Sequence, residues 1–296
     1  MKNKYVVIIL LMMSVCFFAC SKSSVKEMDL IIVAGQSNAV GYDANADELA
    51  ADSSDKQVLF WWRCGDPVPD QYDSTSHQKW THLQAQPKGN PNKTKGVKRQ
   101  YGNFRYKAGF GPEMGLARKL MAEEGKEFAI VKVAFSGTSV SNDWNPSDAG
   151  SRGACYRSLI AETKAAIQAA KEKNIHLRLR AMLWVQGESD ANERSAARYA
   201  KDLAAMIESL RYDLQAPQFT VLLALNTHFN EEKNIFVPKI IEAQKEVAKN
   251  ISDCVYVDTS KAEVANKVHF SSKGTLEIGV QFAEALMKKE KSLLKK

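Results

Sequence analysis

The sequence predicts an α/β fold, a three-layer α/β/α sandwich in which helices cover both faces of a five-stranded, mainly parallel sheet. Two observations support this prediction. Five short apolar runs rich in Val, Ile, Leu and Phe do not alternate with polar residues, which is typical of strands covered on both faces. Helical patterns lie between these runs, and strands that alternate with helices form parallel sheets through right-handed crossovers.

The size and composition of the chain agree with one large domain, expected over residues 29–290. The 296 residues are 45% hydrophobic and 25% charged, which is ordinary for a soluble globular protein. The net charge of +7 is a mild excess, and its one cluster, residues 93–99, is expected to be a solvated loop. We therefore expect no nucleic-acid partner, and we expect a monomer.

Residues 1–19 have the pattern of a signal peptide. Lys2 and Lys4 supply positive charge, and the apolar run that follows is shorter than the ~20 residues that a membrane-spanning helix needs. Cys20 comes directly after a small residue, which resembles the lipobox of bacterial lipoproteins. We expect a lipid on Cys20 to anchor the protein at a membrane surface of a bacterial cell envelope, as a periplasmic or outer-membrane lipoprotein, with residues 20–28 as a short linker. Ordinary secretion is the alternative.

The predicted strands and helices alternate along the rest of the chain. The predicted strands are residues 30–34, 128–135, 179–185, 219–225 and 255–258. Gly111-Pro112-Glu113 begins the first main helix, because proline in the first turn and an early carboxylate are both helix-start signals. The other predicted helices are residues 156–173, 192–212, 237–249 and 271–289.

The long interval between the first strand and Gly111 fits no regular element. Loops of this length are usually functional or disordered, and the tryptophans within it, including Trp61 and Trp62, argue against full disorder. We predict an irregular excursion over the edge of the sheet that carries the active site.

Cysteines and known motifs indicate no metal or cofactor. Cys64, Cys155 and Cys254 remain after the expected processing, and none of them has CxxC spacing, so a structural zinc cluster is excluded and at most one disulfide is expected. The chain has no HExxH, EF-hand or P-loop pattern.

Residue types suited to acyl transfer follow the predicted strands. Ser37 comes after the first strand, Gly137 after the second and Gln186 after the third, and His269 precedes the last helix. Ligands of parallel α/β folds bind beyond the carboxyl ends of the strands. A serine nucleophile needs a histidine within hydrogen-bond reach, and each preorganised donor to the oxyanion can be worth ~3–4 kcal/mol.

Four sequence blocks resemble a known family. GQSN (residues 35–38), SGT (136–138), WVQGESD (184–190) and HFSSKG (269–274) resemble the SGNH-type esterases, most closely carbohydrate esterase family 6 and the sialate O-acetylesterase branch. The resemblance spans about residues 29–290 and includes the FGPE block at 110–113. It implies a flavodoxin-like SGNH hydrolase fold and a secreted serine carboxylic-ester hydrolase that removes acetyl groups from carbohydrates, of the acetylxylan esterase or sialate O-acetylesterase type.

The same resemblance implies roles for individual residues. Ser37 matches the nucleophile and His269 the general base. The N–H groups of Ser37 and Gly137 and the side chain of Gln186 match the oxyanion hole.

Four residues are candidates for substrate binding. Gln36 and Asn38 flank the nucleophile, and Trp144 follows the Gly137 turn and could line an acyl or sugar pocket. Arg63 could line a sugar site or hold the long interval in place.

The chain departs from the family pattern at one position. The family's last block is usually Asp-x-x-His, but Asn266 stands where that aspartate would be. A neutral amide cannot stabilise the imidazolium that forms as the serine loses its proton. We expect Glu188 to orient the histidine instead, with Asp190 and the amide oxygen of Asn266 as alternatives.

Two further alternatives remain. His228 is a rival for the role of base. Asn266 also allows a different class of function, a catalytically weak glycan-binding protein with an esterase fold.

Overall fold

The computed structural model describes residues 25–89, 104–146, 150, 152–230 and 233–294. The expected signal peptide, the lipidation site Cys20 and the basic cluster at 93–99 lie outside these residues and stay predictions. In the part of the chain that is described, no helix is long and apolar enough to span a membrane.

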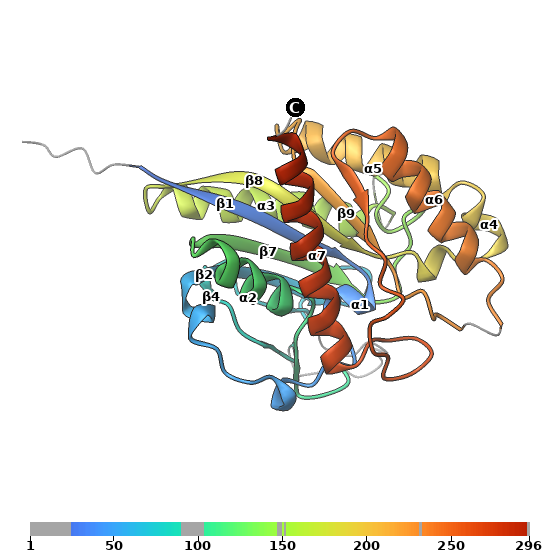
Figure 1. The fold of residues 1–296 in the computed structure, drawn as a ribbon, viewed down its shortest axis with the longest axis horizontal. Coiled ribbons are helices and arrows are strands. Elements are labelled where there is room, and N and C mark those ends of the chain that lie inside the picture. The colour runs from blue at the N-terminus through green and yellow to red at the C-terminus, as the bar shows by residue number, and fades with distance from the viewer. Residues whose placement is uncertain (1–24, 90–103, 147–149, 151, 231–232, 295–296) are drawn as a thin grey trace, which may run out of the picture.

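The central sheet has the strand order β10-β9-β8-β1-β7-β2, and these neighbours are all parallel (Figure 1). They are β1 (Lys26–Gly35), β2 (Val58–Gly65), β7 (Phe128–Phe135), β8 (Ile175–Val185), β9 (Thr220–Ala224) and β10 (Cys254–Tyr256). Two short strands, β3 (Ser74–Thr75) and β4 (Thr81–His82), pair antiparallel with β2, and β5 (Gln86–Pro87) pairs with β6 (Ala108–Gly109). The predicted α/β class with a mostly parallel sheet is confirmed.

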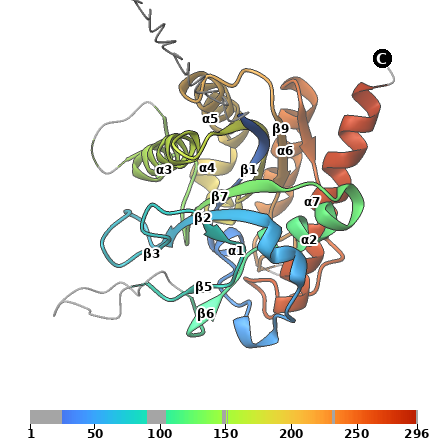
Figure 2. The same cartoon turned by 90° about the vertical axis from the view of Figure 1, so that its left-hand side faces the viewer.

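Helices form a layer on each face of the sheet. They are α1 (Ser37–Val40), α2 (Glu113–Glu124), α3 (Ala154–Lys171), α4 (Glu193–Ala196), α5 (Tyr199–Asp213), α6 (Val237–Asn250) and α7 (Ser272–Leu293), with 3-10 turns at Ala46–Glu48, Ser53–Gln57 and Glu188–Asp190. Figure 2 looks toward the β2 edge, with α3 on one side of the sheet and α2 and α7 on the other.

The alternation of side chains along β1 explains the two layers. Leu30 and Ile32 are fully buried in the core beneath α3, α5 and α6, whereas Ile31 and Val33 are fully buried in the core beneath α2 and α7. Successive residues of a strand point to opposite faces, so a strand buried on both sides must be apolar at every position. The prediction that this continuous apolar run forms a strand covered on both faces is therefore confirmed for β1.

The prediction of five strands missed β2, which lies in the interval predicted to be irregular. β2 extends the sheet beyond β7, with Trp61 paired to Val131. The indole nitrogen of Trp61 donates a hydrogen bond to Glu162 of α3 at 2.8 Å. The aromatic run has high β-propensity, but its polar partners come from distant segments that the local pattern does not reveal.

Most element boundaries differ from the prediction by a few residues, and two of the differences change the predicted organisation. β1 begins at Lys26, inside the segment expected to be a linker. The helix expected over residues 192–212 is divided into α4 and α5.

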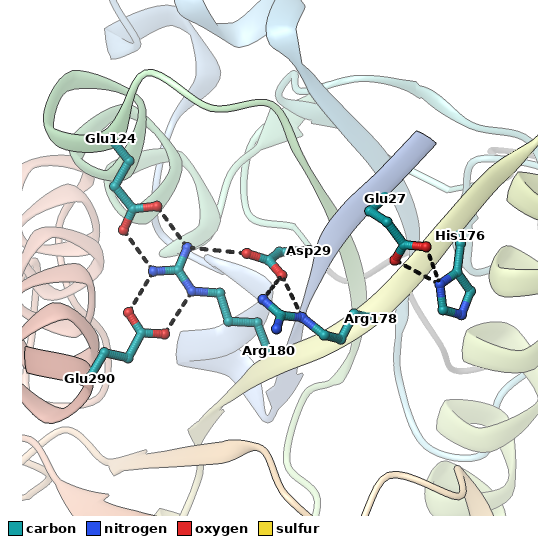
Figure 3. A network of polar contacts seen from close by, with 7 residues as sticks. All are labelled: Glu27, Asp29, Glu124, His176, Arg178, Arg180 and Glu290. Atoms are coloured by element: carbon teal, nitrogen blue, oxygen red, sulfur yellow. Dashed lines mark hydrogen bonds and ion pairs between the residues drawn. The ribbon is translucent and has the colours of Figure 1, made fainter. Parts of the chain in front are cut away.

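A polar network ties the helices to the sheet at the end opposite the predicted site (Figure 3). Arg180, in the middle of β8, donates hydrogen bonds to Glu124 of α2 at 2.6 and 2.9 Å. It also donates to Glu290 of α7 at 2.7 and 2.8 Å. Its side chain is only 10% exposed, whereas that of neighbouring Arg178, bound to Asp29, is 73% exposed.

This contrast gives a stability prediction. Replacing Arg180 by alanine leaves two partly buried carboxylates without their partner, and we expect the free energy of unfolding to fall by about 2–3 kcal/mol. The matched change Arg178→Ala removes an exposed pair and should cost less than about 1 kcal/mol. Urea unfolding of both variants checks this, and equal losses would contradict it.

Candidate active site

Ser37 lies at a sharp turn between a strand and a helix. β1 ends at Gly35, whose φ of +140° and close approach to Val185 exclude a side chain, since a Cβ would lie 2.1 Å from the Val185 carbonyl oxygen. The short helix α1 follows the carboxyl end of β1 (Figure 1). Ser37 is its first residue, and the Ser37 carbonyl oxygen accepts the N–H of Gly41, which ends the helix. This turn places the Ser37 hydroxyl at the edge of the sheet.

A buried ion pair between β7 and α2 holds the end of α1 in place. The Lys132 ammonium of β7 donates to the carbonyl oxygen of Val40 at 3.0 Å and to Oε1 of Glu113 at 2.8 Å, and both charged side chains are fully buried. Glu113 Oε1 also accepts the N–H of Gly111 at 2.8 Å. The FGPE block therefore both begins α2 and anchors the helix that carries Ser37.

Two backbone N–H groups are available to an oxyanion. Ser37 N–H and Gly137 N–H donate no hydrogen bond to any residue that the structure describes. Gly137 follows β7, the strand next to β1, and has a φ of +68°. A Cβ built on Gly137 would meet nothing within 4 Å, so open space lies beside this backbone. The pair could stabilise the negative oxygen of a tetrahedral intermediate.

Gln186 does not have the geometry expected for an oxyanion donor. Its Nε2 donates to the carbonyl oxygen of Thr138 at 2.9 Å and to Oδ2 of Asp190 at 2.7 Å, and its Oε1 accepts the Tyr199 hydroxyl at 2.9 Å. Both amide protons are thus used, and the side chain is fully buried. Gln186 instead ties β8 to the loop that carries Gly137.

Asn38 ties the turn that carries Ser37 to the segment that carries His269. Its Nδ2 donates to the carbonyl oxygen of Val268 at 3.2 Å, and its Oδ1 accepts the N–H of Phe270 at 3.1 Å. The residue after Ser37 therefore holds both chain neighbours of His269. Asn38 is 2% exposed and is occupied by these contacts, which disagrees with its expected role in substrate binding.

The imidazole of His269 contacts Asp43, a residue that was not among the expected acids. Nδ1 of His269 lies 3.0 Å from Oδ2 of Asp43, and the Tyr42 ring packs against the imidazole at 4.7 Å between centroids. An ionised carboxylate only accepts hydrogen bonds, so Nδ1 carries the proton and Nε2 is left as the acceptor. Burial lowers the pKa of His269, although Asp43 acts in the opposite direction.

The acids expected to orient His269 have other partners. Glu188 Oε1 accepts Asn38 Nδ2 at 2.8 Å and the N–H of Asn226 at 3.0 Å. Asp190 accepts Gln186 Nε2 and, at 2.8 Å, the N–H of Val140. The expectation that Glu188, or else Asp190, contacts the imidazole therefore disagrees with the structure. Burial raises the pKa of both carboxyls.

Asn266 does not contact the imidazole either. Its Oδ1 accepts the N–H groups of Val268 and His269 at 2.8 and 3.0 Å, and its Nδ2 donates to Asp43 Oδ2 at 2.5 Å. Its amide oxygen thus shapes the turn before the base, and its amide nitrogen holds Asp43.

The environment of Glu188 leads to a prediction opposite to that expected for an orienting acid. Glu188 is buried, and its Oε2 has no hydrogen-bond partner among the described residues. Glu188→Gln keeps an oxygen for Asn38 and Asn226 and removes a buried charge, so we expect kcat within a few-fold of wild type. Glu188→Ala leaves two buried donors unsatisfied and should cost about 1–3 kcal/mol for each. Ester hydrolysis and urea unfolding measure these effects, and a severe loss of kcat in Glu188→Gln would contradict the prediction.

Two of the remaining candidates for substrate binding are buried among neighbouring side chains. Trp144 is fully buried and packs against Phe135 and Trp184, so it belongs to the core and does not line a sugar pocket. Gln36 is 4% exposed, and its Oε1 accepts the N–H of Ser189 at 3.1 Å. These contacts make Gln36 part of the support of the nucleophile turn.

Arg63 and His228 also have partners. Arg63 Nε donates to Asp73 at 2.8 Å and NH1 to Glu162 at 3.4 Å, which holds the segment after β2 against α3. His228 Nε2 lies 2.7 Å from the carbonyl oxygen of Ser260 and does not replace His269.

The described residues include no group of three or more His, Cys, Asp or Glu side chains that could hold a metal ion. Cys64, Cys155 and Cys254 are buried thiols and form no disulfide with one another.

Sequence reasoning missed Asp43. It lies six positions after Ser37 in the segment Gly41-Tyr42-Asp43-Ala44-Asn45, for which the sequence predicts no regular element. The available signal was an acidic residue between apolar neighbours, close to the nucleophile in sequence.

Comparison with solved structures shows the same fold. A protein from Arabidopsis thaliana aligns with a TM-score of 0.61 and 18% identity over 88% of this chain and 98% of that one. NanS aligns with a TM-score of 0.59 and 17% identity over 91% and 99%, respectively. A carbohydrate acetylesterase from Xanthomonas citri aligns with a TM-score of 0.52 and 16% identity over 87% of this chain and 55% of that one.

A family model provides the functional comparison. A comparison with curated proteins gave no match. The model described as carbohydrate esterase, sialic acid-specific acetylesterase, matches residues 27–288, which is most of the chain. This match supports carbohydrate acetylesterase activity and agrees with the resemblance seen in the four sequence blocks. The chain therefore belongs to the sialic acid-specific acetylesterase family of carbohydrate esterases.

Proposed function

We propose that the protein is a carbohydrate O-acetylesterase in which Ser37 is the nucleophile and His269 the general base. The main support is the arrangement around Asn38, which joins the nucleophile turn to both neighbours of His269. The free N–H groups of Ser37 and Gly137 and the family match add to it.

The proposed reaction has two half-reactions. Ser37 Oγ attacks the acetyl carbonyl carbon while His269 Nε2 takes the hydroxyl proton, and the carbonyl oxygen becomes an oxyanion facing the Ser37 and Gly137 N–H groups. The intermediate collapses, the bond to the sugar oxygen breaks, and His269 gives its proton to that oxygen. Water then attacks the carbonyl carbon of the acetyl-enzyme while His269 takes a proton from the water. The bond between this carbon and Ser37 Oγ breaks, His269 gives the proton back to Oγ, and acetate is released.

The alternative of a weak glycan-binding protein loses its main support. It depended on the absence of an aspartate at position 266, but Asp43 supplies a carboxylate to His269 from another segment. An arrangement with nucleophile, base and carboxylate is more than a binding protein requires.

Acetate release from a panel of esters tests the proposal. Acetylated xylan, O-acetylated sialic acid and 4-nitrophenyl acetate are compared with 4-nitrophenyl butyrate, using wild type and Ser37→Ala. We expect wild type to release acetate from at least one acetylated sugar, and the two sugar arms distinguish the xylan and sialate types. If wild type is no faster than Ser37→Ala on every acetyl ester, the esterase proposal is wrong.

A further inference from the structure

We infer that Asp43 is the positioning residue that orients His269, and that Asn266 serves to hold Asp43. This inference rests on the proposed function, because it concerns the base of the same site. It assigns the orienting carboxylate to the loop after the nucleophile and not to the block that contains the histidine.

The contacts of the Asp43 carboxylate support this role. Its side chain is 3% exposed, and Oδ2 accepts hydrogen bonds from His269 Nδ1 at 3.0 Å and Asn266 Nδ2 at 2.5 Å. Oδ1 lies 3.4 Å from NH1 of Arg105. Donors thus surround both oxygens, and a buried carboxylate held in this way can fix the tautomer of the imidazole and stabilise the imidazolium.

The backbone on both sides of Asp43 is fixed to other parts of the site. Tyr42 N–H donates to the carbonyl oxygen of Ser37 at 3.1 Å, and the Tyr42 carbonyl oxygen accepts the N–H of Arg105 at 3.1 Å. Asn45 N–H donates to the hydroxyl of Ser272 at 2.9 Å, at the start of α7. The nucleophile and the proposed acid therefore belong to one short, tethered segment, so they hold a constant position relative to each other.

The identity of residue 266 follows from the position of Asp43. An aspartate at 266 would place a second carboxylate where Asn266 Nδ2 now lies 2.5 Å from Asp43 Oδ2. Two carboxylates at that separation cannot both be ionised without a large penalty. An amide supplies a donor of the same shape with no charge. The asparagine is thus the residue that an acid at position 43 requires, and it does not indicate a damaged triad.

The charged groups around His269 determine how its pKa should respond to substitution. Burial lowers the pKa, the hydrogen bond and charge of Asp43 raise it, and the charge of Arg105 lowers it. The Tyr42 ring packs on the imidazole without adding charge. Removing the charge of Asp43 should therefore lower the pKa of His269 further.

The experiment compares Asp43→Asn with Asp47→Asn as a matched control. Asp47 lies in the same segment, is exposed, and uses only its backbone N–H in the local turn, so it gives the same charge change away from the imidazole. We expect Asp43→Asn to lower kcat on the order of 10²- to 10⁴-fold with little change in KM. The acid limb of its pH–rate profile should move to lower pH. Asp47→Asn should match wild type in kcat and in the position of the acid limb.

Two more variants test the pairing of positions 43 and 266. Asn266→Asp places two carboxylates together, so it should lower the free energy of unfolding. The exchange Asp43→Asn/Asn266→Asp should recover part of the kcat lost in Asp43→Asn, because the acid then stands where the family resemblance expects it. These variants keep the inference testable if Asp43→Asn fails to fold.

NMR titration of the His269 imidazole supplies a readout that does not depend on activity. We expect the His269 pKa to be lower in Asp43→Asn than in wild type and unchanged in Asp47→Asn. The inference is overturned if Asp43→Asn leaves both kcat and the His269 pKa as in Asp47→Asn. A wild-type protein with no esterase activity but with this pKa shift would contradict the proposed function and leave the Asp43 contact supported.

Discussion

Replacement of Ser37 by alanine is expected to lower kcat for acetyl-ester hydrolysis on the order of 10⁶-fold, the scale of loss when a serine nucleophile that works with a histidine base is removed. In the proposed mechanism Ser37 forms the bond to the acetyl carbon, and no other residue is assigned this step. Residual hydrolysis should come from the Ser37 and Gly137 N–H groups, which alanine at position 37 retains.

The matched control for this variant is Ser189→Ala. Ser189 lies at the same edge of the sheet, and its backbone N–H, which alanine keeps, donates to Gln36. Ser189→Ala should retain kcat within a few-fold, and both variants should unfold at the urea concentration of wild type. Comparable losses of kcat in the two would show that the site is sensitive to any missing hydroxyl and would contradict a specific role for Ser37.

Replacement of His269 by glutamine is expected to cause a loss of kcat of similar size, on the order of 10⁶-fold, because the serine proton then has no base to receive it. The two losses should not add, since both residues act in one step. A double variant Ser37→Ala/His269→Gln should therefore be nearly as active as either single variant, and additive losses would contradict the shared step.

If His269 is the base, as proposed, its protonation should determine the pH dependence of the wild-type enzyme. His269 accepts a proton only when it is neutral, and its pKa lies below the ordinary value of 6.5 because it is buried. We expect kcat/KM to be constant near neutral pH and to fall about tenfold per pH unit once the pH is below this lowered pKa. A profile whose acid limb lies above pH 6.5 would assign the limb to another group.

The sequence alone predicted most of the fold because strands buried on both faces must be apolar at successive positions. That requirement identifies β1 and β7 from local residues. β2 was missed because it contains the charged residue Arg63, which interrupts the apolar run expected of a buried strand. The partner of both Trp61 and Arg63 is Glu162, about a hundred positions away in the sequence. A local pattern contains no information on such a pairing.

The candidate site, too, was predicted only in part from the sequence. Ser37, Gly137 and His269 follow from the chemistry of residues near strand ends and from the family blocks, and the structure places each of them at one edge of the sheet. The roles expected for Glu188 and Gln186 disagree with their contacts. Which carboxylate reaches the imidazole depends on a loop's path, and the path of the segment after Ser37 is fixed by tertiary hydrogen bonds.

The central claim is that Ser37 is the nucleophile, and covalent labelling tests it most directly. The wild-type protein is treated with a fluorophosphonate, which reacts with activated serines, and the modified peptide is located by mass spectrometry while residual esterase activity is measured. We expect one adduct, on Ser37, whose amount rises in proportion to the activity lost. Ser37→Ala should form no adduct, and His269→Gln should be labelled slowly. Loss of activity with the adduct on another residue, or full activity with Ser37 completely modified, would contradict it.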